Sequence, residues 1–531
     1  MKNILFIAVV LLWVPMLGFA QNVKHLTANP NLTIEELTNI YSAVNKDQKA
    51  QAESIVESFP TLWNAMTTDE QLRFIELTNK MFKAKLRPIP HVADFIKTYH
   101  LLTESNQSIK SEQNFARSVE YIIAEIPNQF STQMKIYSDV LQNKILNRYS
   151  GLKWYADKAD LFYCDFDSVP KIVFPKLDLV ASNEKDSLQI KNTSGYFMPT
   201  AMLFVGNKGV VDWQKAGVEE NVYATFDKYT ILLRSVHIEI EQALYHNPAY
   251  FSAPQLGKLE DRVMSTEVSA EKITYPRFTS YDKNIKVNNI YAEVDFCGGI
   301  QVRGNTFMGQ GDTVNLSELQ FKRDNEIVLV TKAINFVLKP QQLYSKACQI
   351  VLYVKKDSIG LEKDSIFHSA IELQYTPNNR ELWLVRGKEG PMRMPFLDSY
   401  HQIEIYADAL HWKMTEENIE FGSLPGPMGN VNALFESTSY FSADRLYQFM
   451  GMNQVNPLYT LYEFYRKSGL KVATIEEIAA YFRYSRSDVQ SLIFQLVQYG
   501  FVDYDMNKHT VKYLPKLGNY LLNDLKKKGK K

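Results

Sequence analysis

Ile290-Tyr-Ala-Glu-Val-Asp-Phe296, Ile327-Val-Leu-Val330 and Gln349-Ile-Val-Leu-Tyr-Val354 are typical of the stretch that decides the fold, which runs from about Lys171 to Lys413. Each segment is rich in β-branched, aromatic or alternating apolar residues, and Gly, Asn, Asp or Pro fills the gaps. This pattern predicts a long central region of β-strands. Helical sequence lies on both sides of it, so we expect a multidomain α+β protein.

The turns within this region fit two architectures, a sandwich and a parallel β-helix. Asn-Gly hairpin turns are not obvious between the segments. Glycine-rich corners recur instead, as in Cys297-Gly-Gly-Ile-Gln-Val-Arg-Gly304 and Gly309-Gln-Gly-Asp312. Because stacked coils need tight corners, we favour a parallel β-helix for residues 156–425 and keep the sandwich as the alternative. A helical interruption is expected around residues 241–245.

Composition excludes several classes of protein. The chain has 531 residues, enough for two to four domains, and a hydrophobic content of 45%, which argues against disorder. Lys+Arg and Asp+Glu are equal at 59 each. This balance argues against a protein that binds nucleic acid or an anionic membrane over its whole surface.

The N-terminus carries an export signal. Lys2 precedes a nearly unbroken apolar run over residues 4–17, and Gly18-Phe-Ala20 places small residues where a signal peptidase reads them. Residues 1–20 are therefore interpreted as a signal peptide cleaved before Gln21. No later segment reaches about 18 apolar residues, so we expect no transmembrane segment in the mature chain. The predicted location is the periplasm or the cell surface.

Residues 21–155 are predicted to form a helical domain, either a bundle or a short α-solenoid. Thr33-Ile-Glu-Glu36 and Thr67-Thr-Asp-Glu70 have the pattern of capping boxes. Apolar residues then recur with the helical period, and prolines separate the helices.

The C-terminal part begins with a change to Gly and Pro over residues 422–429, which marks a boundary. Residues 426–525 are predicted to hold a helical segment and then a winged-helix-like module over 457–515, whose order is helix, helix and β-hairpin. Thr474-Ile-Glu-Glu477 is a third capping box. Residues 526–531 form a basic tail, interpreted as a solvated chain end.

The strand Val236-His-Ile-Glu-Ile-Glu241 is the candidate metal site. Alternation places His237, Glu239 and Glu241 on one face. Imidazole and carboxylates are metal ligands, although the same pattern is typical of the wet face of a half-buried strand. The sequence assigns no third element that would complete this candidate site.

The candidate catalytic residues are Glu293, Asp295 and Arg303. The two carboxylates share a strand face, and paired carboxylates perform glycosidic chemistry, whereas a basic residue beside acids suits uronic-acid elimination. The alternative is again a solvated strand face. Nucleophile elbows, phosphate-binding glycine loops and HExxH are absent from the sequence, so we expect no cofactor.

The winged-helix-like module raises the question of DNA binding. Its second helix carries one basic residue, Arg486, and Asp488 near the helix start repels phosphate. We therefore expect no DNA partner. Cys164, Cys297 and Cys348 are odd in number and far apart, which excludes a CxxC metal site and a disulfide framework.

Several segments together resemble the N-terminal part of long exported proteins of unknown function from Gram-negative bacteria. They are Val294-Asp-Phe-Cys-Gly-Gly-Ile-Gln-Val-Arg-Gly304, Asp364-Ser-Ile-Phe-His368 with Ile371-Glu-Leu-Gln-Tyr375, and Glu476-Glu-Ile-Ala-Ala-Tyr-Phe482 to Gly500-Phe-Val-Asp-Tyr504. Members of that group are longer, and the resemblance implies no activity. With export and no catalytic motif, it leads us to expect a non-enzymatic envelope scaffold with a protein or glycan partner. A β-helix polysaccharide lyase or glycosidase is the alternative.

Overall fold

The computed structural model describes residues 25–105, 108–354, 364–422, 433–450 and 455–528. The expected signal peptide, most of the Gly/Pro-rich boundary and the end of the basic tail lie outside these residues. No helix within the described ranges combines the length and apolarity needed to span a membrane. The chain divides into two compact units, Met1–Asn207 with Lys228–Val236, and Lys208–Asp227 with His237–Lys531.

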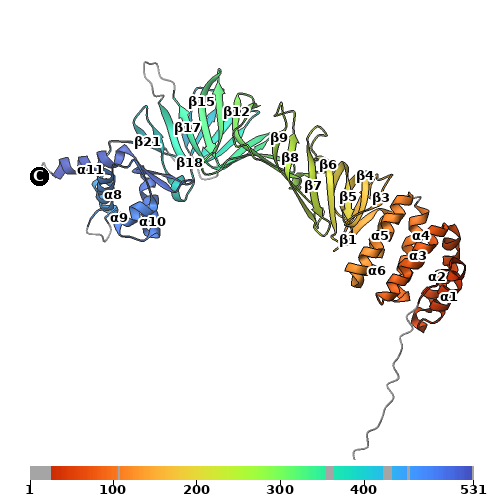
Figure 1. The fold of residues 1–531 in the computed structure, drawn as a ribbon. Coiled ribbons are helices and arrows are strands. Elements are labelled where there is room, and N and C mark those ends of the chain that lie inside the picture. The colour runs from red at the N-terminus through yellow and green to blue at the C-terminus, as the bar shows by residue number, and fades with distance from the viewer. Residues whose placement is uncertain (1–24, 106–107, 355–363, 423–432, 451–454, 529–531) are drawn as a thin grey trace, which may run out of the picture. The chain divides into compact units, whose positions relative to one another are not determined.

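The described residues of the first unit begin with six α-helices (Figure 1). They are α1 (Thr33–Ser42), α2 (Lys49–Ala65), α3 (Thr68–Lys83), α4 (Ala93–Glu104), α5 (Ile109–Glu125) and α6 (Phe130–Asn143). The capping box of α3 is present, because Thr67 and Glu70 satisfy each other's backbone N–H groups. The box predicted at Thr33 is wrong: Thr33 is already the first residue of α1, and no side chain caps that helix.

Aromatic side chains form the core of the helical region. Five aromatic rings form a series in which each ring contacts the next one along the chain, with centroid distances of 5.2–6.2 Å. They belong to Phe74, Phe95, Tyr99, Phe115 and Tyr137. All five residues are at most 2% exposed. Because aromatic side chains bury large areas, this series of contacts joins α3, α4, α5 and α6 into one core.

Twenty-four strands of the described chain form one antiparallel sheet. Those that begin in the first unit are β1 (Ile145–Tyr149), β2 (Leu152–Asp157), β3 (Tyr163–Asp167), β4 (Val169–Ser182), β5 (Ser187–Met198) and β6 (Leu203–Asp212), and β7 (Tyr223–Leu232) has residues in both units. The second unit continues with β8 (His237–His246), β9 (Gln255–Arg262), β10 (Arg277–Ser280), β11 (Ile285–Tyr291), β12 (Val294–Arg303), β13 (Thr306–Gln310), β14 (Ser317–Arg323), β15 (Glu326–Ala333) and β16 (Asn335–Lys339).

The remaining strands of the sheet also lie in the second unit. They are β17 (Gln342–Tyr353), β18 (Ser365–Thr376), β19 (Glu381–Val385), β20 (Phe396–Asp398), β21 (Ile403–Tyr406), β22 (Ala409–Lys413), β23 (Glu420–Gly422) and β24 (Leu434–Ser437). The prediction of a parallel β-helix is therefore wrong, because the strands pair antiparallel, as β4 does with β5, β14 with β15 and β17 with β18.

Two hairpins show how turns without an Asn-Gly pair join antiparallel strands in this sheet. Between β14 and β15, Arg323 pairs with Glu326, and both turn residues, Asp324 and Asn325, have positive φ. This is the backbone geometry of a two-residue hairpin turn, supplied here without a glycine. Between β12 and β13 the turn begins at Gly304, also with positive φ, so the predicted coil corner is a hairpin turn.

The expected helical interruption at residues 241–245 is also wrong. These residues belong to β8, and the pairing of β8 with β9 shifts between Ile240 and Ala243, as at a β-bulge. The extra residue of a bulge disrupts strict alternation.

In the described residues, the C-terminal part holds five α-helices and a separate three-stranded sheet. The elements are α7 (Ala443–Gln448), α8 (Pro457–Ser468), β25 (Val472–Thr474), α9 (Ile475–Phe482), α10 (Arg486–Gln498), β26 (Val502–Asp505), β27 (Thr510–Tyr513) and α11 (Pro515–Lys528). The capping box predicted at Thr474 and Glu477 is present at the start of α9. The sheet has the order β25-β27-β26.

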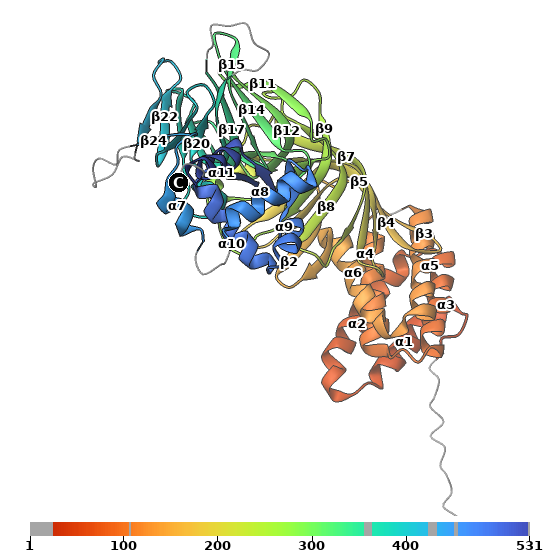
Figure 2. The ribbon, with the colours of Figure 1, turned by 90° about the vertical axis from the view of Figure 1, so that its left-hand side faces the viewer.

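This part packs on the neighbouring strands of the same unit (Figures 1 and 2). Its hydrophobic core includes Met394, which precedes β20, and the half-buried side chains of Phe367 and Leu397 pack against it. Phe367 and Leu397 are paired residues of β18 and β20. The core of the C-terminal elements is therefore continuous with one face of the sheet.

Candidate functional site

The first candidate site lies on the antiparallel pair β8–β9. His237 and Glu239 project from the same face of β8, and Glu260 of β9 is the direct cross-strand partner of Glu239. One ligand atom from each of these three residues lies within 4.8 Å of the other two. The structure thus brings two of the three predicted metal ligands together and adds Glu260, which only strand register could identify.

The third predicted ligand, Glu241, has other partners. The hydroxyl of Tyr281 donates to Glu241 Oε2 at 2.8 Å, and Lys258 Nζ lies 3.6 Å from Glu241 Oε1. Lys258 also lies 3.0 Å from a Glu239 oxygen and 3.5 Å from a Glu260 oxygen. The hydrogen bond from Lys258 lowers the pKa of Glu239. The single ammonium group therefore contacts three carboxylates and offsets part of their negative charge.

The three candidate catalytic residues do not all come together, because Arg303 lies at the far end of β12. Glu293 occupies the turn between β11 and β12 with φ +60° and forms an ion pair with Arg380. Asp295 forms an ion pair with Lys322 and accepts a hydrogen bond from the backbone N–H of Asn289 at 2.9 Å. These bonds hold the pKa of Asp295 below its ordinary value, although burial opposes them.

Arg303 is the last residue of β12, eight residues beyond Asp295, so it lies roughly 26 Å along an extended strand. Its cross-strand partners are Thr306 and Arg277. Since acid–base catalysis requires hydrogen-bond reach, these three side chains do not form one catalytic site in this structure.

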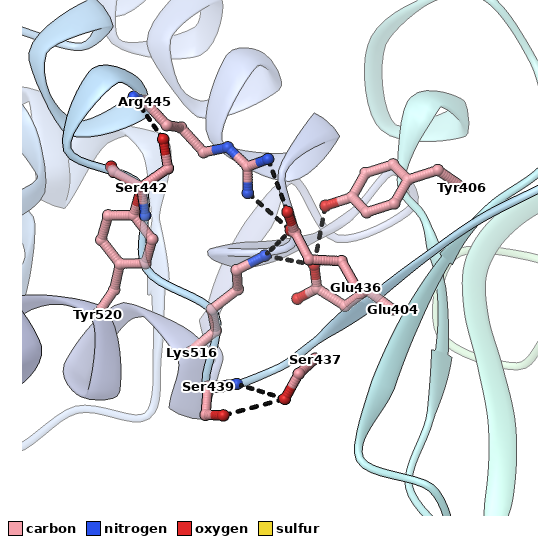
Figure 3. Close-up of polar contacts among 9 residues, drawn as sticks. All are labelled: Glu404, Tyr406, Glu436, Ser437, Ser439, Ser442, Arg445, Lys516 and Tyr520. Atoms are coloured by element: carbon pink, nitrogen blue, oxygen red, sulfur yellow. Dashed lines mark hydrogen bonds and ion pairs between the residues drawn. The ribbon is translucent and has the colours of Figure 1, made fainter.

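A buried ionic cluster, which the sequence analysis did not find, joins the sheet to the C-terminal helices (Figure 3). Lys516 of α11 forms ion pairs with Glu404 of β21 and with Glu436 of β24, the latter at 3.2 Å. Arg445 of α7 binds Glu436 through two hydrogen bonds of 2.7 and 2.8 Å. Tyr406 donates to Glu404 at 2.8 Å. The four charges sum to zero.

The environment determines the charge states within this cluster. Burial raises the pKa of Glu404, and the opposing attraction of Lys516 is the next largest influence. Burial also acts to raise the pKa of Glu436, but hydrogen bonds from Arg445 hold it below its ordinary value. The bidentate arginine therefore keeps Glu436 ionised, as expected for paired guanidinium and carboxylate groups.

Strand register explains why the two glutamates meet. Glu404 and Glu436 are directly paired residues of β21 and β24. Like charges opposite each other destabilise a sheet unless a cation lies between them. Lys516 provides that cation, so the packing of α11 and the pairing of β21 with β24 depend on each other. Glu404 and Lys516 are 112 residues apart, and no local pattern links them.

The histidines of the last strands have structural partners. His368 is fully buried; its Nε2 lies 2.9 Å from the Met394 carbonyl oxygen, and its Nδ1 accepts from the Ala370 N–H at 3.1 Å. Burial lowers the pKa of His368 to about 3, so the ring is neutral. His411 stacks on Trp383 and contacts Glu381 and Glu420.

The cysteines have no disulfide partners, and Cys164 and Cys348 are buried, as expected for small apolar side chains. Comparison of the chain with protein families, with curated proteins and with solved structures found no match. The arguments about function therefore rest on the geometry of the described residues.

Proposed function

We propose that this chain is an exported, non-enzymatic protein of the cell envelope that acts as an interaction scaffold for a protein or glycan partner. The observation that carries the proposal is the buried cluster of Lys516, Glu404, Glu436 and Arg445. It fixes the C-terminal elements to the sheet, together with a continuous hydrophobic core. A rigid composite surface of this kind suits binding more than the opening and closing of a catalytic cleft.

The C-terminal elements have the order of a winged helix, and we propose that they serve as a protein-contact module. Helix α10, which corresponds to a recognition helix, packs on the 3₁₀-helix Gly390–Arg393, and the ring of Phe494 lies against Gly390. At its N-terminal end, Arg486 forms an ion pair with Glu476 at 2.9 Å. Because these two contacts already use part of the α10 surface and its basic residue, they do not favour binding of a phosphate backbone to this helix.

An apolar surface segment supports the choice of a protein partner. Leu434 and Phe435 of β24 are 58% and 54% exposed, and Tyr440 and Tyr447 nearby in sequence are 50% and 63% exposed. Among the described strands, β24 pairs only with β21. Exposed apolar side chains at a sheet edge are typical of surfaces that meet another chain.

Site-specific photo-crosslinking in cells tests this proposal. A photoreactive residue at Leu434 should give discrete adducts with an envelope protein, whereas the same residue at exposed Lys413 of β22 should not. Mass spectrometry identifies the adduct. Recovery of the protein only from the cytoplasm would overturn the export part of the proposal. Saturable turnover of a polysaccharide, lost on substitution of Glu293 or Asp295, would overturn the non-enzymatic part.

A further inference from the structure

A histidine and two glutamates converge on one face of the strand pair β8–β9. His237 Nδ1 lies 3.7 Å from Glu239 Oε1, and Glu260 faces Glu239 across the strand pair. We propose that His237, Glu239 and Glu260 bind a divalent transition-metal ion, for which Zn²⁺ is the best fit. This inference does not depend on the proposed scaffold function.

The donor set determines the choice of metal. One imidazole nitrogen and two carboxylate oxygens form a three-ligand protein set that leaves a position for water, as zinc sites of mixed nitrogen and oxygen ligands do. Mg²⁺ and Ca²⁺ prefer oxygen ligands alone. Imidazole favours Zn²⁺ and Co²⁺. The site should therefore select transition metals over Mg²⁺ and Ca²⁺.

The backbone holds these ligands in place before any metal binds. His237 and Glu239 are two residues apart on β8, and Glu260 is held opposite by the ladder between β8 and β9. The His237 ring also contacts the Tyr275 ring edge-to-face at 6.3 Å. Ligands carried by paired strands are positioned more precisely than ligands on loops.

Lys258 is the internal competitor of the metal. Two glutamates directly opposite on neighbouring strands repel each other, and the Lys258 ammonium relieves that repulsion. Its side chain is 29% exposed and long enough to turn toward solvent. A bound metal would supply the compensating charge in its place, so removal of the lysine charge should strengthen metal binding.

Metal titration of the purified protein tests this assignment. Co²⁺ is followed by its visible absorption and Zn²⁺ by calorimetry, at about pH 7.5, where an ordinary histidine is neutral. We expect one Co²⁺ or Zn²⁺ per chain and much weaker binding of Mg²⁺. Glu260→Gln and His237→Ala should each weaken binding by at least about tenfold. Lys258→Gln should strengthen it.

Glu241→Gln is the matched control, because Glu241 is the third ligand suggested by sequence but not by structure. Its affinity for Zn²⁺ should stay close to that of the unmodified protein. The proposal is overturned if no saturable binding occurs, or if Glu241→Gln and Glu260→Gln lose affinity equally. Weaker binding by Lys258→Gln, with an unchanged circular dichroism spectrum, would also contradict it.

Discussion

Lys516 in α11 forms an ion pair with Glu404 in β21, and both side chains are at most 2% exposed. Removal of one partner leaves an unpaired charge in a buried site, which typically costs about 3–5 kcal/mol. We expect Lys516→Met to lower the free energy of unfolding by this amount, measured by urea denaturation. Lys467→Met is the control, because Lys467 pairs with Glu463 on the exposed face of α8 and should change stability far less than Lys516→Met does.

Gly500 precedes β26 and lies against the same cluster. It has φ +68°, and an added Cβ would lie 2.5 Å from Glu404 Oε1. Gly469 has nearly the same φ, +70°, but nothing lies within 4 Å of its Cβ position. Gly469→Ala should therefore lower the free energy of unfolding by the backbone cost alone, about 1 kcal/mol. Gly500→Ala should lower it distinctly more. Equal losses in thermal or urea unfolding would contradict a close contact between Gly500 and Glu404.

We expect the buried imidazole of His368 to make the folded protein less stable in acid. Its pKa is lowered from an ordinary 6.5 to about 3 by burial, so the folded state excludes a proton that the unfolded state binds. The stabilising contribution is complete above pH 6.5 and is lost as the pH falls from 6.5 toward 3, by at most about 1.4 kcal/mol per pH unit. Urea unfolding at a series of pH values should show this slope, and His368→Gln should flatten it. An unchanged slope in the variant would assign the effect to other groups.

For Glu112 in α5 we expect the opposite pH dependence of stability, in the helical region. Burial, and then its hydrogen bond to Glu70, raise the pKa of Glu112 to about 7. The folded state therefore holds a proton that the unfolded state loses above about pH 4.5, and stability falls as the pH rises from 4.5 to 7. Glu112→Gln should raise the free energy of unfolding at pH 8 by roughly 1 kcal/mol, reduced for partial exposure, with little gain at pH 4. If Glu112→Gln raised the free energy of unfolding more at pH 4 than at pH 8, the raised pKa of Glu112 would be contradicted.

Part of the candidate site was visible in the sequence. Alternation along residues 236–241 placed His237 and Glu239 on one face, because side chains of a strand point to opposite faces in turn. The bulge after Ile240 and the identity of the facing residue, Glu260, follow from the pairing of β8 with β9. Sequence spacing contains no information about that register.

The sequence by itself determined the helical N-terminal part, the β-rich centre and the capping boxes of α3 and α9, since these depend on contacts within a few residues. Only the tertiary structure decided that the strands pair antiparallel, that Arg303 lies far from Glu293 and Asp295, and that Lys516 meets Glu404 and Glu436. Strand order and buried charge pairs join residues far apart in the chain. Their energies depend on burial and register, which local sequence does not specify.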